Sequence, residues 1–276
     1  MGHNATGSPT IGVIGGNGQL GKWCAEIFRA HGSTVLVSDV GTELSNRDVA
    51  ARAEIVVVSV PIGVTGSVLE EVSSSLRSDQ LIVDLTSVKT PFVPFMESSK
   101  AEVLSVHPMF APSLSSKRDQ TCIVCPVRQG SLAAYFKGVL EREGLRLINM
   151  TPDAHDRMMA VVQGLTHFQA IAAAHCMAAM NFQPAESLES ASPVYRLRLA
   201  MIGRILAQSP RLYAEIQIFN PYVTEVLQHL QRSQERLMGF VTAKDVDGFV
   251  AEFERVRDAL GTFGQESLQE VSRVVS

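Results

Sequence analysis

The stretch Ile11-Gly12-Val13-Ile14-Gly15-Gly16-Asn17-Gly18-Gln19-Leu20-Gly21 decides the fold of the first half of the chain. A short apolar strand pattern runs into Gly16-x-Gly18-x-x-Gly21, and a helical pattern follows at once. A second strand pattern, 34–39, ends in the acid Asp39. The glycines alone are a weak signal. Here they follow a strand and open a helix, and an acid comes roughly 20 residues after them. This order is the full context of a dinucleotide-binding site.

Each residue type in this motif has a physical role. Gly16 permits the tight turn, Gly18 lets the backbone approach a pyrophosphate, and Gly21 lets the helix pack on the strand. The helix N-terminus offers N–H groups to that pyrophosphate. Asp39 is expected to accept hydrogen bonds from the ribose and to repel a 2′-phosphate, which favours NAD. The alternative is that the glycines serve packing alone. The expected cofactor-binding residues are Gly16, Asn17, Gly18, Gln19, Leu20, Gly21 and Asp39, with Ser59, Val60 and Pro61 after the third strand.

Composition limits the class of protein. The chain has 276 residues, 46% of them hydrophobic and 19% charged, which is enough for two domains with their own cores. The formal net charge of −4 argues against a nucleic-acid partner. No apolar run approaches the roughly 18 residues of a membrane span. The first nine residues lack the apolar core of a signal peptide, so we expect a disordered tail and a cytoplasmic protein.

Four cysteines are present, and two of them form Cys122-x-x-Cys125. This spacing occurs in redox and metal sites. Here it lies in a strand pattern, with no helix start to stabilise a thiolate and no second pair. We therefore expect a structural role, a reducing cytoplasm and no metal.

Strand and helix patterns alternate along the first half of the chain. This alternation predicts an α/β fold with a doubly wound parallel sheet, in which ligands bind at the carboxyl ends of the strands. The strand patterns are 10–14, 34–39, 55–60, 81–85, 103–106, 122–125 and 145–149, and helical patterns cover 20–30 and 64–76.

After residue 150 only helical patterns remain, at 155–181, 193–208, 212–238 and 246–275. We therefore expect a tail at 1–9, a nucleotide-binding domain at 10–150 and an all-α domain at 151–276. Alanine-rich helices such as those of the second domain commonly pack against a second copy, which predicts a homodimer.

The carboxyl edge of the predicted sheet carries a candidate base. His107 follows a strand, where a histidine suits general base catalysis. It could equally be structural. Lys89 and Ser87 follow the neighbouring strand and could reach the same place. His155, just after the domain boundary, could cap a helix start or be a core or surface histidine with its hydrogen bonds satisfied.

Arg196 and Arg204 lie eight residues apart in a helical pattern, so they share a face that is otherwise apolar. Burying them is costly without anions. Arginine grips carboxylates bidentately, so the pair suggests a substrate with carboxylates. Solvated or interdomain arginines are the alternative.

Several blocks together resemble prephenate dehydrogenases, most closely the dehydrogenase part of the bacterial bifunctional chorismate mutase–prephenate dehydrogenase. The likeness covers essentially all of the chain after residue 10. It implies a Rossmann domain, an all-α dimerisation domain and NAD-dependent oxidative decarboxylation of prephenate to 4-hydroxyphenylpyruvate in tyrosine biosynthesis. The blocks are Ser59-Val60-Pro61-Ile62, Asp84-Leu85-x-Ser87-Val88-Lys89, His107-Pro108-Met109-Phe110, Gln163-x-Leu165-x-His167-Phe168 and Ser192-Pro193-x-Tyr195-Arg196-Leu197.

The resemblance also implies roles for single residues. His107 would be the base acting on the C4 hydroxyl, with Ser87 positioning the base or the hydroxyl. Arg204 would bind a carboxylate of the substrate, supported by Arg196 and Lys89. The other residues implied for the substrate pocket are His167, Gln163 and Tyr213.

One departure leaves the substrate open. Thr166 stands where the nearest relatives carry an arginine, and loss of that cation would suit a substrate with its own positive charge. Relatives of this kind act on 4-amino-4-deoxyprephenate and give 4-aminophenylpyruvate in antibiotic pathways. Arogenate is a third candidate.

Two other classes of function stay open. A dinucleotide-binding regulatory protein without turnover would share the fold, but it would not need the base at His107. Imine and β-hydroxyacid reductases usually place a catalytic lysine on the long helix, and residues 155–181 contain none.

Overall fold

A computed structural model describes residues 7–111 and 117–275. The predicted tail at 1–9 therefore falls largely outside the described residues. The described chain divides into two compact units. The first runs to Ala160 and also includes Ala214–Pro221, and the second comprises Val161–Tyr213 and Tyr222 onward. This division by contacts first changes unit after Ala160, and the domain boundary expected at residue 150 stays a prediction.

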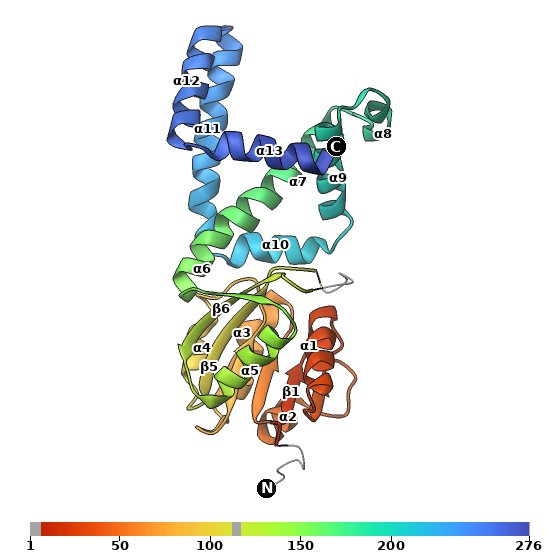
Figure 1. Ribbon diagram of the computed structural model, residues 1–276, viewed down its shortest axis with the longest axis vertical. Coiled ribbons are helices and arrows are strands. Elements are labelled where there is room, and N and C mark those ends of the chain that lie inside the picture. The colour runs from red at the N-terminus through yellow and green to blue at the C-terminus, as the bar shows by residue number, and fades with distance from the viewer. Residues whose placement is uncertain (1–6, 112–116, 276) are drawn as a thin grey trace. The chain divides into compact units, whose positions relative to one another are not determined.

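The first unit contains a seven-stranded sheet in the order β2-β1-β3-β4-β5-β6-β7. Figure 1 shows helices of this unit, among them α1 (Gln19–Ala30) and α5 (Ser131–Arg142), beside the sheet. Its strands are β1 (Ile11–Ile14), β2 (Val35–Ser38), β3 (Ile55–Val58), β4 (Leu81–Asp84), β5 (Glu102–Pro108), β6 (Thr121–Arg128) and β7 (Arg146–Asn149). All neighbours are parallel except β5 and β6, which are antiparallel. The predicted doubly wound parallel sheet is thus confirmed, with one antiparallel pair that the sequence did not indicate. Antiparallel neighbours need no crossover helix between them.

Alternation along the strands builds two hydrophobic layers. Ile55 and Val57 of β3 face one layer, whereas Val56 and Val58 face the other. The first layer is covered by α1 (Gln19–Ala30) and α5 (Ser131–Arg142). The second is covered by α2 (Asn46–Arg52), α3 (Ile62–Ser73) and α4 (Val93–Glu97). Strands buried on both faces read as nearly continuous apolar runs, which is why the sequence revealed them.

The strand register brings the functional segments to one edge. Ile14 is paired with Ser38 and Val58, Val58 with Asp84, and Asp84 with Ser105. The glycine turn, the residues after β2 and β3, and the turn after β4 therefore leave the sheet at the same level, which is where parallel sheets bind ligands.

The remaining elements are helical. In chain order they are α6 (Pro152–Met159), a π-helical turn (Ala160–Leu165), α7 (Thr166–Ala179), α8 (Pro184–Ser187), a 3₁₀ turn (Leu188–Ser190), α9 (Pro193–Leu206), α10 (Pro210–Phe219), α11 (Val223–Ala243), α12 (Val246–Ala259) and α13 (Phe263–Val275).

Three predicted helices proved to be more than one element. The pattern at 155–181 is interrupted by the π turn. The pattern at 212–238 is broken at Asn220-Pro221, and that at 246–275 near Gly261, which has a φ of +58°. Proline cannot continue a helix, and glycine adopts the left-handed conformation without strain.

The turn after β1 depends on the absence of a side chain at Gly21. A Cβ there would lie 2.3 Å from the carbonyl oxygen of Gly15. Since this neighbour is backbone, Gly21→Ala should shift the turn, cost about 1–3 kcal/mol of unfolding free energy, and lower Tm by several degrees in thermal unfolding. Gly239→Ala in α11 is the control, because a Cβ there meets no atom within 4 Å. Equal Tm values for Gly21→Ala and the unmodified protein would contradict this account.

Candidate active site

A pocket of about 730 Å³ opens at the carboxyl edge of β1, β2 and β3. Its lining includes seven residues at strand ends and in the glycine turn: Gly15, Asn17, Gly18, Asp39, Ser59, Val60 and Pro61. Six of these were expected from the sequence, and Gly15 was not. The expected residues Gly16, Gln19, Leu20 and Gly21 shape the turn and the start of α1 rather than lining the pocket.

The glycine turn fits a pyrophosphate. Gly15, not Gly16, takes the left-handed conformation, with a φ of +80°. Gly16 is needed for packing instead, because a Cβ there would lie 2.6 Å from Val37 Cγ1. Gly18 precedes α1 as its N-cap without a side chain. The backbone of the turn and the N–H groups of the first turn of α1 can therefore approach an anion closely.

Asp39 is held in place by the turn that it faces. Its Oδ2 accepts a hydrogen bond of 2.8 Å from the N–H of Asn17, and its Oδ1 accepts one of 2.7 Å from the N–H of Val40. A carboxylate has about four acceptor positions, so both oxygens can also accept from ribose hydroxyls. Its negative charge at that place would repel a 2′-phosphate.

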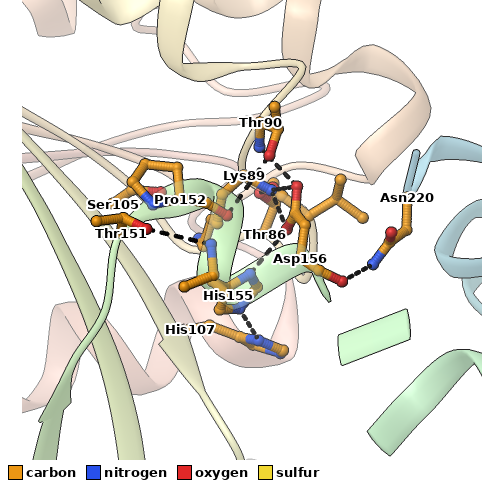
Figure 2. Close-up of polar contacts among 12 residues, drawn as sticks. Thr86, Lys89, Thr90, Ser105, His107, Thr151, Pro152, His155, Asp156 and Asn220 are labelled. Atoms are coloured by element: carbon orange, nitrogen blue, oxygen red, sulfur yellow. Dashed lines mark hydrogen bonds and ion pairs between the residues drawn. The ribbon is translucent and has the colours of Figure 1, made fainter. Parts of the chain in front are cut away.

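His107, near the end of β5, is bonded to a second histidine (Figure 2). Its Nδ1 lies 2.9 Å from Nε2 of His155, and Nδ1 of His155 lies 2.8 Å from Oδ1 of Asp156. Of the two roles left open for His155, helix cap and core histidine, the first falls to Thr151, whose side chain caps α6 by accepting from the N–H of Ala154. His155 is instead a buried partner of the candidate base. The adjacent His-Asp pair was the sequence signal for it.

Asp156 is fixed by groups from two other segments. Its carboxylate accepts from the backbone N–H of Lys89 at 2.9 Å and from that of Thr90 at 2.7 Å. The Asn220 side chain donates to its carbonyl oxygen at 2.9 Å. Figure 2 shows these contacts converging on α6. The carboxylate that orients His155 is therefore itself oriented.

Lys89 is buried beneath this group and has no exposed surface. Its Nζ lies 2.7 Å from Oδ2 of Asp84 and 2.7 Å from the carbonyl oxygen of Val106. The Ser105 hydroxyl donates to the other Asp84 oxygen. Lys89 is thus committed to a buried ion pair, and its support of the site is positional and electrostatic. Ser87 lies half-buried in the same turn.

Burial keeps both histidines neutral. Burial, the neighbouring His155 and the Lys89 ammonium hold the pKa of His107 well below 6.5. Burial also lowers the pKa of His155, although Asp156 opposes this. Burial tends to raise the pKa of Asp156, but hydrogen bonds from His155 and Thr90 outweigh it and lower the pKa. At neutral pH the group comprises one carboxylate and two neutral rings.

A second cluster of expected residues lies within the second unit. The rings of His167 and Tyr213 meet edge to face with centroids 4.7 Å apart. Burial and the charge of Arg204 lower the pKa of His167. The buried Nδ1 of His167 has no hydrogen-bond partner within the described ranges.

Two other expected residues lie elsewhere in that unit. Arg196, two turns before Arg204 on α9, donates instead to the carbonyl oxygen of Leu188. Gln163 lies in the π turn.

The two cysteines of Cys122-x-x-Cys125 lie on β6, as predicted, and face opposite hydrophobic clusters. Burial raises the pKa of each thiol to about 12, which leaves them inert. Over 7–111 and 117–275, no three His, Cys, Asp or Glu side chains converge as a metal site would require. None of the helices described there combines the length and apolar character needed to cross a bilayer.

The neutral histidines predict an acid-sensitive fold. In the unfolded chain both rings take up protons as the pH falls below about 6.5, whereas in the folded protein the lowered pKa values delay this. The unfolded state then binds more protons than the folded state. The free energy of unfolding should therefore decrease as the pH is lowered, by up to about 1.4 kcal/mol per pH unit for each histidine. Urea unfolding across pH 5–7 measures it. His107→Gln should reduce the slope, and His175→Gln, at an exposed position, should not. An undiminished slope in His107→Gln would contradict the burial argument.

Asp39 should set the choice of dinucleotide. Asp39→Ala removes the expected bonds to the ribose, which as charged hydrogen bonds are worth about 1.5–3 kcal/mol, so the Kd for NAD should rise roughly tenfold or more. Discrimination against NADP should relax at the same time. Calorimetric titration with both dinucleotides measures this. Glu43→Ala, which removes an exposed charge from the same loop, is the control. NADP binding to the unmodified protein as tightly as NAD would show the assignment to be wrong.

Comparison with known proteins agrees with this geometry. Residues 30–148 match the nucleotide-binding domain of prephenate dehydrogenase, and residues 151–255 match its dimerization domain. A probable arogenate/prephenate dehydrogenase of Methanocaldococcus jannaschii is 36% identical over 94% of this chain and 62% of its own length. The T-protein of Haemophilus influenzae is 31% identical over 94% of this chain and 69% of its own. The chain thus spans about two thirds of these relatives.

A solved structure shows the same fold. The crystal structure of prephenate dehydrogenase from Aquifex aeolicus is 20% identical, with a TM-score of 0.70 over 89% of this chain and 96% of the other. The match to a nucleotide-binding domain, together with the glycine turn and Asp39, confirms the prediction of NAD as the cofactor. Because both domain models match in order and together cover most of the sequence, the chain belongs to the prephenate dehydrogenase family.

Proposed function

We propose that this protein oxidises prephenate with NAD to 4-hydroxyphenylpyruvate and CO2, a step of tyrosine biosynthesis. Membership of the family supports the coarser part of this proposal, the activity of a prephenate/arogenate-type dehydrogenase. The observation that carries the proposal is His107, a ring held neutral by burial at the carboxyl edge of the sheet that also forms the nucleotide pocket. A neutral imidazole at this place can take a proton from a substrate. A protein that only senses a dinucleotide would not require such a group.

The chemistry asks little of the protein beyond placement. NAD, when bound, supplies the acceptor for the hydrogen and electron pair that leave C4. His107 takes the proton of the C4 hydroxyl, which becomes a carbonyl and then the phenol of an aromatic ring as the ring carboxylate departs as CO2. Formation of the aromatic ring drives the reaction, so position and charge are the contributions left to side chains.

Arg204 is proposed to bind a carboxylate of the substrate. It is exposed on α9, and its charge acts on His167 and Tyr213. The buried Nδ1 of His167 leaves a polar atom for a ligand to satisfy. Gln163, Arg196 and Ser87 are proposed to support binding from the segments already described.

The amino-substituted substrate is the second candidate. Thr166, exposed on α7 just before His167, offers a hydroxyl and no charge beside the proposed binding residues. A substrate with an ammonium at C4 would meet no added cation there. Both 4-amino-4-deoxyprephenate and arogenate carry an ammonium, in different places, so the same assay can separate the three.

We also propose that the protein is a homodimer. Helices α11, α12 and α13 expose large apolar side chains, among them Met238, Val241, Phe253, Phe263 and Leu268. Apolar groups gathered on exposed helices mark an interaction surface, and the matched dimerization domain overlaps the first two of these helices.

Formation of NADH with prephenate, arogenate and 4-amino-4-deoxyprephenate side by side tests the proposed activity. We expect the highest kcat/KM with prephenate. His107→Asn should lower kcat by roughly 10²–10⁴-fold. Arg204→Ala should raise KM by at least about tenfold, since a lost charged hydrogen bond costs about 2–5 kcal/mol, and Arg204→Lys should rescue it only partly because lysine lacks the planar fork.

Arg198→Ala, on the same helix and also exposed, is the matched control and should leave KM unchanged. A higher kcat/KM with either amino substrate would replace prephenate as the assignment. Turnover of none of the three would contradict the proposal. Near-normal kcat in His107→Asn would remove His107 from the mechanism.

A further inference from the structure

We infer that His155 and Asp156 form a positioning pair that locks His107 in the tautomer with its proton on Nδ1 and its lone pair on Nε2. The inference rests on the proposed function only for the role of this lone pair, which is to accept the proton of the substrate hydroxyl. The tautomer itself is a property of the protein without substrate.

The carboxylate of Asp156 fixes the first proton of the chain. An ionised carboxylate can only accept hydrogen bonds. Asp156 receives the backbone N–H groups of Lys89 and Thr90, which favours the charged form. The nitrogen that faces it at 2.8 Å, Nδ1 of His155, must therefore carry a proton.

The proton on Nδ1 of His155 determines whether the other ring nitrogen, Nε2, is a donor or an acceptor. A neutral imidazole has one N–H, so Nε2 of His155 is an acceptor. It lies 2.9 Å from Nδ1 of His107. Two acceptors cannot share this distance favourably, so Nδ1 of His107 must be the donor. A neutral His107 then has its lone pair on Nε2, and Nε2 is the atom that can accept a proton.

The pair is built rigidly enough to impose this order. His155 and Asp156 are both fully buried on α6. Asn220 holds the Asp156 carbonyl oxygen, and Thr151 caps the helix start. Alternative ring orientations would leave a buried donor or acceptor without a hydrogen bond, and each such unsatisfied group costs about 1–3 kcal/mol.

The arrangement also serves the protonated state of His107. When Nε2 takes a proton, Nδ1 keeps its hydrogen bond to His155, whose far side faces the Asp156 anion. The new positive charge therefore meets an acceptor aligned toward a carboxylate, while the Lys89 charge beside it is already paired with Asp84. His155 and Asp156 act through His107 and need not touch the substrate.

Nitrogen-15 NMR of histidine-labelled, full-length protein without substrate tests the inference. We expect His107 at neutral pH to show a protonated Nδ1 and an unprotonated Nε2. Asp156→Asn can present a carboxamide donor to Nδ1 of His155, which should reverse both tautomers and move the His107 proton to Nε2. For that variant we expect kcat to fall at least about 100-fold, as for a general base in the wrong tautomer, with KM changed less than about threefold.

Rescue separates positioning from mere packing. In His155→Gln the amide can accept from His107 and donate to Asp156, whereas His155→Leu can do neither. We expect the glutamine variant to keep the His107 tautomer and a higher kcat than the leucine variant. Asp153→Asn, an exposed carboxylate on the same helix, is the matched control and should change neither measurement. Thermal unfolding of each variant confirms that it is folded.

The outcomes are distinct. A proton on Nε2 of His107 in the unmodified protein, or an unchanged tautomer in folded Asp156→Asn, would overturn the inference. If His107 has the expected tautomer but no candidate substrate is oxidised, the proposed function fails while the positioning pair stands.

Discussion

The buried ion pair between Lys89 and Asp84 is the constraint on which the site depends. Two charges removed from water are costly unless every remaining hydrogen-bonding position is filled. Here Asp84 also receives the hydroxyls of Thr86 and Ser105, and Lys89 also donates to the carbonyl oxygen of Val106. The pair therefore joins β4, β5 and the turn between residues 84 and 90 in one arrangement.

Two consequences follow from that arrangement. The turn presents the N–H groups of Lys89 and Thr90 to Asp156, which anchors α6 against the sheet. The bond to Val106 fixes the residue immediately before His107. The same ammonium also helps to keep His107 neutral. One charge that the substrate cannot reach thus shapes both the position and the protonation of the proposed base.

The structural elements predicted correctly are those that local sequence determines. The glycine turn and the apolar strands depend on residues close together in the chain. The roles of Asp39 and His107 stay predictions, drawn from their places at strand ends. The partnership with His155 joins positions 48 residues apart, so periodicity could not reveal it. Lys89 was expected near the substrate because it follows a strand end. The sequence does not show whether a side chain at such a place points to the ligand or, as here, into the core. The broken helices were missed because apolar periodicity continues across Asn220-Pro221 and Gly261, although the backbone does not.

The anchoring of Asp156 also matters for protein design. The block His107-Pro108-Met109-Phe110 is the visible mark of this base, yet a copy of it in another sheet would carry a histidine with an undetermined proton. The smallest transferable unit is discontinuous. It requires the turn with Asp84 and Lys89, the strand with His107, and the helix start with His155 and Asp156 in register. Grafting this chemistry onto a new scaffold is therefore a problem of matching three backbone segments at once, and a single-segment graft would reproduce the motif without its electrostatics.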